Sequence, residues 1–308
     1  MYLPGVRHFL SRNGMIRDFI LVSVHNTDRT RDFTPVPNPA RQNSGGGVKF
    51  YEFLSEELLP YLKDNFRTID FTIVLGHSLT GMYSMYLVHN YPEQFQAAVA
   101  ASPYVQYMDD WLAQNISDTD DQLKEESRTI YFSIGSTETD YFEHLDKLKA
   151  IYKNAGEMLT WEFRNFENYN HGKTPLLSYY NGLEFIFREW KIPEKPGDDP
   201  VADIVSHYKK LSEKYNSEIL PGEADLNILG YGFMRSEEFG KAEAIFKYNT
   251  ELYSQSANVW DSFGEFYENR GEKEKARENY LMAVKNGKEL NDPNLAIYER
   301  NLKRVSED

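Results

Sequence analysis

The stretch Gly76–Gly81, with the sequence GHSLTG, constrains the fold of this chain more than any other segment. It follows an apolar run at 71–75 and precedes residues 82–89, in which Met, Tyr and His recur at helical spacing. A strand, a sharp turn and a helix in this order would hold the Ser78 hydroxyl above the edge of a sheet. The turn would also place the backbone N–H of Leu79 at the start of the helix, where it can bind a carbonyl oxygen.

Small residues are needed on both sides of such a turn, because the strand and the helix pass within backbone contact. Gly76 meets this need on the strand side. Thr80 occupies the position at which the pattern has glycine, and Gly81 follows one residue later. The alternative interpretation is an ordinary strand-to-helix turn in which Ser78 caps the helix.

Composition excludes several classes of partner and site. A formal charge of −14 argues against nucleic acids and anionic membranes, because both attract clustered Lys and Arg. No apolar run approaches the roughly 18 residues of a membrane span. The absence of cysteine excludes disulfides, zinc–thiolate sites and a thiol nucleophile. No His/Asp/Glu cluster has the spacing of a metal site, so neither a metal nor a cofactor is expected.

The first part of the chain alternates between expected strands and expected helices. Short apolar runs without a helical period predict strands, and apolar residues at helical spacing predict helices. This alternation implies a mostly parallel, doubly wound sheet in an α/β domain over residues 1–192. The expected strands cover 19–24, 71–75, 95–101, 129–134 and 159–165, and the expected helices cover 48–66, 82–89, 141–153 and 175–190.

A linker is expected at 193–200, where Pro, Gly and acidic residues are concentrated, and a second, all-helical domain is expected at 201–308. Two sets of residues in this domain match at an offset of 34 (264 − 230 = 34), the period of tetratricopeptide repeats. Glycine and alanine would stand where paired helices cross closely, and large side chains would fill the space between pairs. The sets are Leu229, Gly230, Ala242 and Phe246, then Phe263, Gly264, Ala276 and Tyr280.

Ser78, the loop at 135–140 and His171 follow the chain order of an α/β-hydrolase triad, which is nucleophile, acid, histidine. His171 lies in a Gly- and Asn-rich loop after the last expected strand, where its imidazole can take the Ser78 proton and return it to the leaving group. A solvated loop histidine is the alternative interpretation. Glu138 and Asp140 can each orient the imidazole; Glu138 follows the strand more closely and is preferred, with Asp140 as the alternative acid.

Three segments resemble a known family: HNTDRTRDFTP, GHSLTGMYSMYLVHNYPEQFQAAVAASP and NYNHGKTPLLSYYNGLEFIF. They are similar to the bacterial esterases related to the siderophore-hydrolysing enterobactin esterases, some of which carry C-terminal tetratricopeptide repeats. The match covers nearly the whole chain, and the His171-Gly172 loop with the helix after it is its most specific part. The resemblance implies serine ester hydrolysis in an α/β-hydrolase fold, with Ser78 as nucleophile and His171 as base.

The resemblance also implies roles for other residues. The acid of this family is often a glutamate in a Gly-x-x-Glu loop, which Gly135–Glu138 resembles. Asn26 and Arg29 match a family loop near the pocket and would contact the substrate. Family members have further strands before the one expected at 19–24, and a loop after the last of these gives the second oxyanion-hole N–H. These N-terminal strands are expected to be missing here, and one lost donor would cost on the order of 3 kcal/mol.

The leading hypothesis is a serine carboxylesterase that works through an acyl-enzyme, with the Leu79 N–H as one oxyanion donor. Its substrates would be small-molecule esters, including thioesters or siderophore-type esters, because amide cleavage demands more protonation of the leaving group. The alternative is a catalytically inert hydrolase-like protein whose repeats bind a peptide or protein partner; Thr80, the missing strands and the repeats motivate it. A soluble protein of the bacterial cytoplasm or periplasm is expected.

Overall fold

The computed structural model describes residues 3–118, 126–193 and 196–307. Contacts divide the chain into two compact units, of which the first is Met1–Glu189 with Leu211–Glu218. The second is Trp190–Lys210 with Ile219–Asp308. Residues 194 and 195, within the expected linker, lie outside the described residues.

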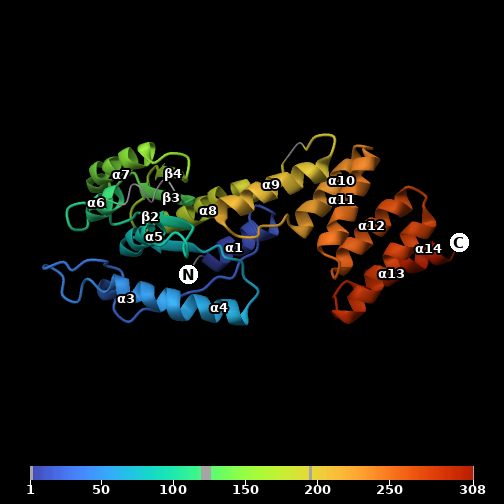
Figure 1. Ribbon diagram of the computed structural model, residues 1–308, viewed down its shortest axis with the longest axis horizontal. Coiled ribbons are helices and arrows are strands. Elements are labelled where there is room, and N and C mark those ends of the chain that lie inside the picture. The colour runs from blue at the N-terminus through green and yellow to red at the C-terminus, as the bar shows by residue number, and fades with distance from the viewer. Residues whose placement is uncertain (1–2, 119–125, 194–195, 308) are drawn as a thin grey trace. The chain divides into compact units, whose positions relative to one another are not determined.

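The first unit contains a parallel four-stranded sheet with the strand order β1-β2-β3-β4 (Figure 1). All three neighbouring pairs are parallel and in continuous register, so that His77 at the end of β1 lies opposite Ala101 at the end of β2. The order does not reverse within the described residues. The strands are β1 (Ile73–His77), β2 (Ala97–Ala101), β3 (Arg128–Gly135) and β4 (Leu159–Phe166), and they correspond to four of the five expected strands.

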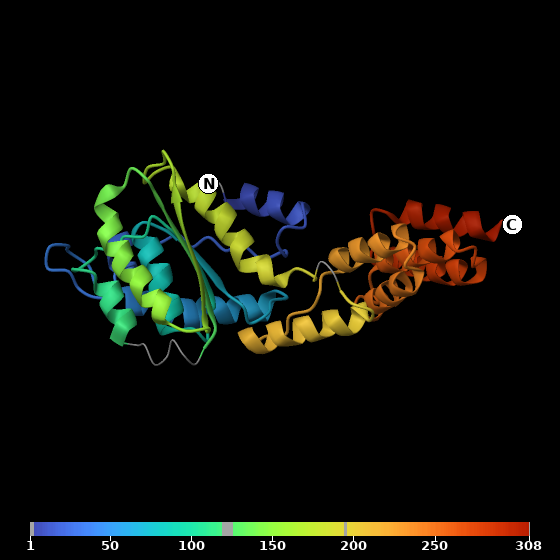
Figure 2. The ribbon, with the colours of Figure 1, turned by 90° about the horizontal axis from the view of Figure 1, so that it is seen from above.

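Helices cover both faces of this sheet (Figure 2). Each step between neighbouring strands passes through a helix, which places α5 (Leu79–Asn90), α6 (Trp111–Asp118) and α7 (Phe142–Asn154) on one face. Their apolar side chains form one core with Ala98, Ala100, Ile130 and Phe132 of the strands. On the other face α8 (Thr174–Phe187) packs so closely that a Cβ at Gly182 would lie 2.4 Å from Val99 Cγ1. Helix α1 (Leu3–Arg12) lies beside α8.

The helix expected at 48–66 is present as three consecutive helical segments. They are α3 (Gly47–Glu52), the π-helix η1 (Phe53–Leu58) and α4 (Leu59–Asn65), with Pro60 in the first turn of α4. Proline has no N–H to donate and its ring clashes with the carbonyl four residues earlier, so the turn before it widens to π geometry. Phe53 and Tyr61 therefore do not share a buried face; Tyr61 is 58% exposed.

The prediction of a strand at 19–24 is wrong. Residues 17–26 have no regular secondary structure, and Ile20, Val22 and Val24 are exposed. A strand forms only where a neighbour pairs with its backbone N–H and C=O groups. Within the described part of the chain β1 is hydrogen-bonded to β2 alone, so the apolar run makes no pairing with the sheet.

The second unit is helical throughout the residues that the structure describes. A Cβ at Gly230 would lie 2.9 Å from the Phe246 ring, and one at Gly264 would lie 2.7 Å from the Tyr280 ring. The same close contact thus occurs in the pairs α10–α11 and α12–α13. The helices of this unit are the first part of α9 (Pro200–Tyr215), then α10 (Glu223–Arg235), α11 (Phe239–Leu252), α12 (Ala257–Asn269), α13 (Lys273–Glu289) and α14 (Leu295–Ser306).

Among all described helices, none combines the length and the apolar character that crossing a membrane requires. The remaining short helices are α2 (Arg29–Asp32), η3 (Thr139–Tyr141) and η4 (Arg188–Trp190).

Candidate active site

Ser78 stands at a sharp turn between β1 and α5. Its backbone is in an unusual conformation, with φ 61° and ψ −119°, and its side chain makes no capping hydrogen bond. The interpretation of Ser78 as a helix cap is therefore wrong. The backbone is held instead by the Ser78 N–H donating to Ala101 O (2.9 Å) and by the Ser78 carbonyl accepting from the N–H of Tyr104 (3.0 Å). A strained backbone that is held in place by hydrogen bonds is typical of functional positions.

The glycines around Ser78 are required by close backbone approach. A Cβ at Gly76 would lie 2.1 Å from Thr80 O, and one at Gly81 would lie 3.2 Å from Ala101 O. Thr80, which departs from the expected glycine, has a role in the turn. Its hydroxyl accepts from the His77 N–H (2.9 Å) and donates to His77 O (2.8 Å), so it stabilises the strand end that leads into Ser78.

Leu79 begins α5. The first N–H groups of a helix have no carbonyl four residues earlier in the same helix to receive them. The Leu79 N–H, next to Ser78 at the positive end of the helix dipole, is therefore in a position to receive a developing negative charge.

His171 is hydrogen-bonded to Glu138, through Nδ1 and Oε2 at 2.6 Å. Because the carboxylate can only accept, Nδ1 carries the proton, and Nε2 of the neutral imidazole is left as a proton acceptor. The Glu138 side chain is 5% exposed, whereas that of His171 is 39% exposed. The carboxylate is thus enclosed and the imidazole is open to solvent. Asp140 lies in η3 and is exposed.

The second oxygen of Glu138 has partners of its own. Oε1 accepts from the Gly135 N–H (2.8 Å) and from Ser102 Oγ (2.8 Å). Ser102 directly follows β2 in a left-handed conformation, with φ 40°, and is fully buried. Sequence analysis did not single out Ser102. The available signal was a serine directly after β2, at the carboxyl edge of the sheet.

His77 connects the Ser78 turn to the loop that carries His171. Its Nε2 lies 2.8 Å from His171 O, and the two rings are 4.5 Å apart. Burial, together with the neighbouring His171, lowers the pKa of His77. His77 is therefore neutral and donates from Nε2, because a carbonyl oxygen only accepts. The two partners of this hydrogen bond are 94 positions apart in the chain.

The structure thus places Ser78, Glu138 and His171 at the carboxyl edge of one sheet, after β1, β3 and β4. Within the described residues the Ser78 hydroxyl has no hydrogen-bond partner, and His171 is joined to the Ser78 turn through His77. Hydrogen bonds between a nucleophile and its base are often long in proteins without substrate. A cavity of about 180 Å³ adjoins this edge and is lined by Thr137, Glu138, Thr139, Asp140, Tyr141 and His171.

Asn26 and Arg29 lie in the segment that contains the short helix α2. Asp28 caps this helix by accepting from the N–H groups of Thr30 and Arg31, each at 3.0 Å. Asn26 Nδ2 is 3.5 Å from Asp32 Oδ2. Arg29 is exposed, and its charge contributes to lowering the pKa of His77.

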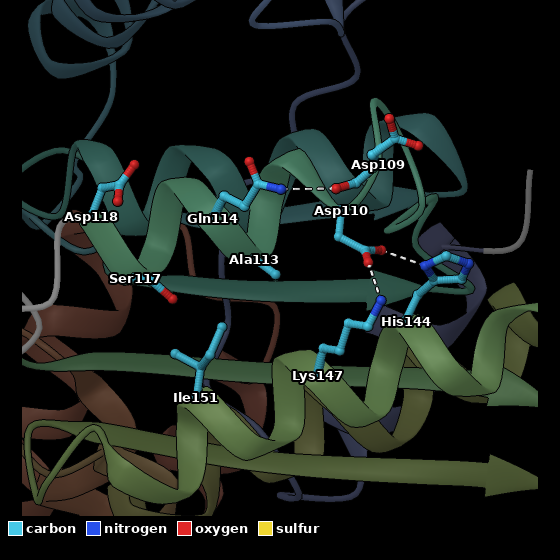
Figure 3. Close-up of a pocket in the computed structure, with 9 residues that line it drawn as sticks. All are labelled: Asp109, Asp110, Ala113, Gln114, Ser117, Asp118, His144, Lys147 and Ile151. Carbon is cyan, nitrogen blue, oxygen red and sulfur yellow. Dashed lines mark hydrogen bonds and ion pairs between the residues drawn. The ribbon is translucent and has the colours of Figure 1, made fainter.

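A larger pocket, of about 650 Å³, lies between α6 and α7, and its lining includes none of the residues discussed above (Figure 3). The carboxylate of Asp110 contacts His144 Nδ1 and lies 2.7 Å from Lys147 Nζ, so it joins the start of α6 to α7. Burial acts to raise the pKa of Asp110, but hydrogen bonds from Lys147 and His144 outweigh it and the pKa is lowered. The arrangement is that of an ion-pair cluster between helices.

Residues 6–180 match the family described as "Putative esterase", and this segment is more than half of the 308 residues. Comparison with curated proteins returned no match.

Solved structures with the same arrangement of elements have low sequence identity to this chain. An IroE-like serine hydrolase from Shewanella oneidensis is 18% identical with a TM-score of 0.72, over 82% of this chain and 85% of that chain. An uncharacterised protein from Capnocytophaga ochracea is 16% identical with a TM-score of 0.61, over 99% and 87%. The BES protein from Bacillus cereus is 19% identical with a TM-score of 0.50, over 59% and 78%. At these identities the likeness is one of fold.

The parallel sheet with helices on both faces, and the strained Ser78 turn at its carboxyl edge, define an α/β-hydrolase-like fold, which is followed by a helical C-terminal region. The chain belongs to the esterase family. This match confirms that the family which the sequence resembles is an esterase family.

Proposed function

We propose that this chain is a serine carboxylesterase in which Ser78 is the nucleophile, His171 the general base and Glu138 the orienting acid. The observation that carries the proposal is the meeting of two features at one sheet edge. One is the strained, uncapped Ser78 turn, and the other is the Glu138–His171 hydrogen bond, which leaves Nε2 as the proton acceptor. The esterase family, and the serine-hydrolase description of the Shewanella oneidensis neighbour, support ester hydrolysis as the reaction.

In the proposed reaction Ser78 Oγ attacks the ester carbonyl while His171 Nε2 takes the hydroxyl proton. The tetrahedral oxyanion is stabilised by the Leu79 N–H at the start of α5. The bond to the alcohol then breaks, and His171 gives the proton to the departing oxygen. Water, deprotonated by His171, attacks the acyl-enzyme in the same way, and the acid product leaves with Ser78 restored. Glu138 stays ionised throughout and stabilises the imidazolium.

The substrates of this proposal are small-molecule esters, among which thioesters and siderophore-type esters are included. Asn26 and Arg29 contact the part of the substrate near the Ser78 turn. The support is the resemblance of this segment, which lies within the matched residues 6–180, to a family loop near the pocket. The leaving alcohol would occupy the cavity beside His171, because His171 must reach its oxygen.

The experiment is covalent labelling with a fluorophosphonate, followed by mapping of the adduct and by turnover of a short-chain nitrophenyl ester. We expect one adduct on Ser78. Ser78→Ala should abolish labelling and lower kcat by at least about a thousandfold, because no other group forms the acyl-enzyme. Ser55→Ala, at a half-buried serine of η1 whose hydroxyl donates to Glu52 O, is the matched control and should retain full labelling.

The choice of acid is tested in the same assay with two isosteric variants. Glu138→Gln should lower kcat by roughly a thousandfold or more, since an amide at this position favours the wrong His171 tautomer. Asp140→Asn should retain kcat within about tenfold of the wild type, because its exposed side chain lines the cavity but lies outside the Glu138–His171 hydrogen bond. Labelling at another residue, or an active Ser78→Ala variant, would overturn the proposed function.

For the second unit, we propose tetratricopeptide-like repeats. The support is the contact between a helix glycine and an aromatic ring, which recurs at Gly230–Phe246 and Gly264–Tyr280 with the offset of 34 (264 − 230 = 34). Repeats of this kind stack helix pairs through such close crossings.

A further inference from the structure

We infer that the buried hydroxyl pair Ser102–Thr174 is a positioning device for the proposed active site, which holds Glu138 and the His171 loop in their working geometry. The inference rests on the proposed function. Neither hydroxyl reaches the Ser78 side chain or the substrate cavity, so both act through Glu138 and His171.

The pair lies where three separate loops meet. Ser102 follows β2, Glu138 follows β3, and Thr174 opens α8 three residues after His171. Ser102 Oγ lies 2.8 Å from Glu138 Oε1 and 2.7 Å from Thr174 Oγ1, and Thr174 Oγ1 lies 3.2 Å from His171 O. The pair is therefore the point at which the acid and the backbone of the base are tied to a common element.

The direction of the hydrogen bonds follows from proton counting. Each hydroxyl has one proton, and ionised Glu138 can only accept. Ser102 therefore gives its proton to Glu138 Oε1, and the one proton of Thr174 is shared between Ser102 Oγ, at 2.7 Å, and the more distant His171 O, at 3.2 Å. The bonds run from Thr174 through Ser102 to Oε1, while His171 donates to Oε2. Bonds in such a chain polarise one another in a medium of low dielectric constant.

Burial makes this arrangement rigid. Ser102 and Thr174 are both fully buried, and Glu138 is nearly so. Bulk water therefore cannot reach this position to replace a lost hydroxyl. A buried carboxylate that loses a hydrogen-bond donor here is destabilised. The left-handed backbone of Ser102, with φ 40°, is unfavourable for a residue with a Cβ. This unfavourable backbone places the Ser102 hydroxyl within hydrogen-bond distance of Glu138.

The variants separate the loss of a hydroxyl from the loss of side-chain volume. Thr174→Val keeps the shape of the side chain and loses the hydroxyl, whereas Thr174→Ser keeps the hydroxyl and loses a methyl. Ser102→Ala removes the direct donor to Glu138. Ser133→Ala is the control for loss of a buried hydroxyl, because Ser133 is fully buried and its hydroxyl pairs with Ser178, at 2.6 Å, away from Glu138.

The experiment measures kcat and KM for a nitrophenyl ester, and separately the low-field proton NMR signal of the His171 Nδ1–H, assigned by its loss in His171→Ala. We expect Ser102→Ala and Thr174→Val to lower kcat about ten- to a hundredfold with KM within about twofold, as for loss of a hydrogen bond to a charged group. Both variants should also weaken or broaden the Nδ1 signal. Thr174→Ser and Ser133→Ala should retain kcat within about threefold and keep the signal.

The outcomes separate this inference from the proposed function. If the wild type neither cleaves esters nor labels at Ser78, the proposed function fails, and the Nδ1 signal still decides the positioning role. If the wild type is active but Ser102→Ala and Thr174→Val match Ser133→Ala in both kcat and signal, the positioning role alone is overturned. Should Ser102→Ala fail to fold, the Thr174→Val and Thr174→Ser pair decides the question.

Discussion

His89, at the C-terminal end of α5, is a residue whose protonation the fold opposes. It is fully buried, and its Nε2 is 2.7 Å from the Tyr152 hydroxyl. Burial first, and the positive charge of Arg128 second, lower the pKa of His89 to about 3. The unfolded chain, in contrast, has a histidine pKa near its ordinary value of about 6.5. Between these values the unfolded state binds a proton that the folded state does not.

This difference predicts how stability depends on pH. Because protonation favours the unfolded state, the free energy of unfolding should fall as the pH is lowered from about 6.5 towards 3, by up to roughly 1.4 kcal/mol per pH unit from this residue. In His89→Gln this part of the slope should be absent. Urea unfolding at pH 7.5, 6 and 5 measures the slope for both proteins. Equal slopes would contradict the assignment, whatever the absolute stabilities.

The turn around Ser78 also depends on two single residues, Thr80 and Gly76. Thr80 breaks the glycine pattern, and sequence reasoning counted this departure against a functional turn. The side chain instead forms two hydrogen bonds with the backbone of His77. Gly76 is the glycine that the geometry requires, because a Cβ there would overlap the Thr80 carbonyl.

At the scale of elements, the contact between α8 and the sheet is set by one glycine. A Cβ at Gly182 would lie 2.4 Å from Val99 Cγ1 and 3.0 Å from the Tyr131 ring, and both neighbours are fully buried. This close approach positions α8, whose first residue is Thr174, on the face of the sheet opposite α5.

Gly182→Ala should therefore destabilise the protein, by about 1–3 kcal/mol, because the methyl group forces α8 and the sheet apart. Gly232→Ala is the control: it lies within α10 and nothing is within 4 Å of the added Cβ. In that open position alanine should raise stability by up to about 1 kcal/mol through its helix propensity. Denaturant unfolding measures both, and a neutral Gly182→Ala would contradict the close packing.

The helix at 47–65 and the segment at 17–26 show how elements depend on more than their own pattern. The helical period across 48–66 predicted the first, but Pro60 changes the turn before it to a π-helix. The apolar run at 19–24 looks like a buried strand in isolation. It is not one here, since a strand needs a partner for its backbone, and within the described residues this run pairs with no strand.

At the scale of the whole molecule, helix α9 contributes to both compact units. Its last turn, from Leu211, belongs to the first unit. There the Tyr215 hydroxyl is 2.8 Å from Thr129 Oγ1, and its ring meets that of Phe71 edge-on with centroids 4.9 Å apart. Part of the hydrolase unit is thus supplied by sequence beyond the expected linker.

Tyr215→Ala should therefore destabilise the first unit by about 3–5 kcal/mol, because the ring is buried and leaves a cavity. Lys210→Ala, at an exposed residue of the same helix, is the control and should change stability by less than about 0.5 kcal/mol. Thermal unfolding followed by near-ultraviolet circular dichroism measures the effect. Equal melting temperatures for the two variants would show that the first unit does not need this helix turn.

The sequence by itself determined the features that arise from neighbouring residues. The GHSLTG turn, four strands and the helical second unit follow from glycine placement and from the period of apolar side chains, which act over a few residues. These features also identified Ser78 and His171 as candidates. Local pattern was sufficient because each feature is stabilised mostly within one strand, turn or helix.

Only the tertiary structure decided which side chains meet. Sequence analysis preferred Glu138 and kept Asp140, two residues later, as the alternative acid; in the structure hydrogen bonds from Gly135 and Ser102 enclose Glu138 and leave it facing His171. Ser102 and Thr174 are 72 positions apart, and His77 and His171 are 94 apart. The physical reason is that these bonds join loops from different strands, and their geometry exists only once the parallel sheet has brought those strand ends to one edge.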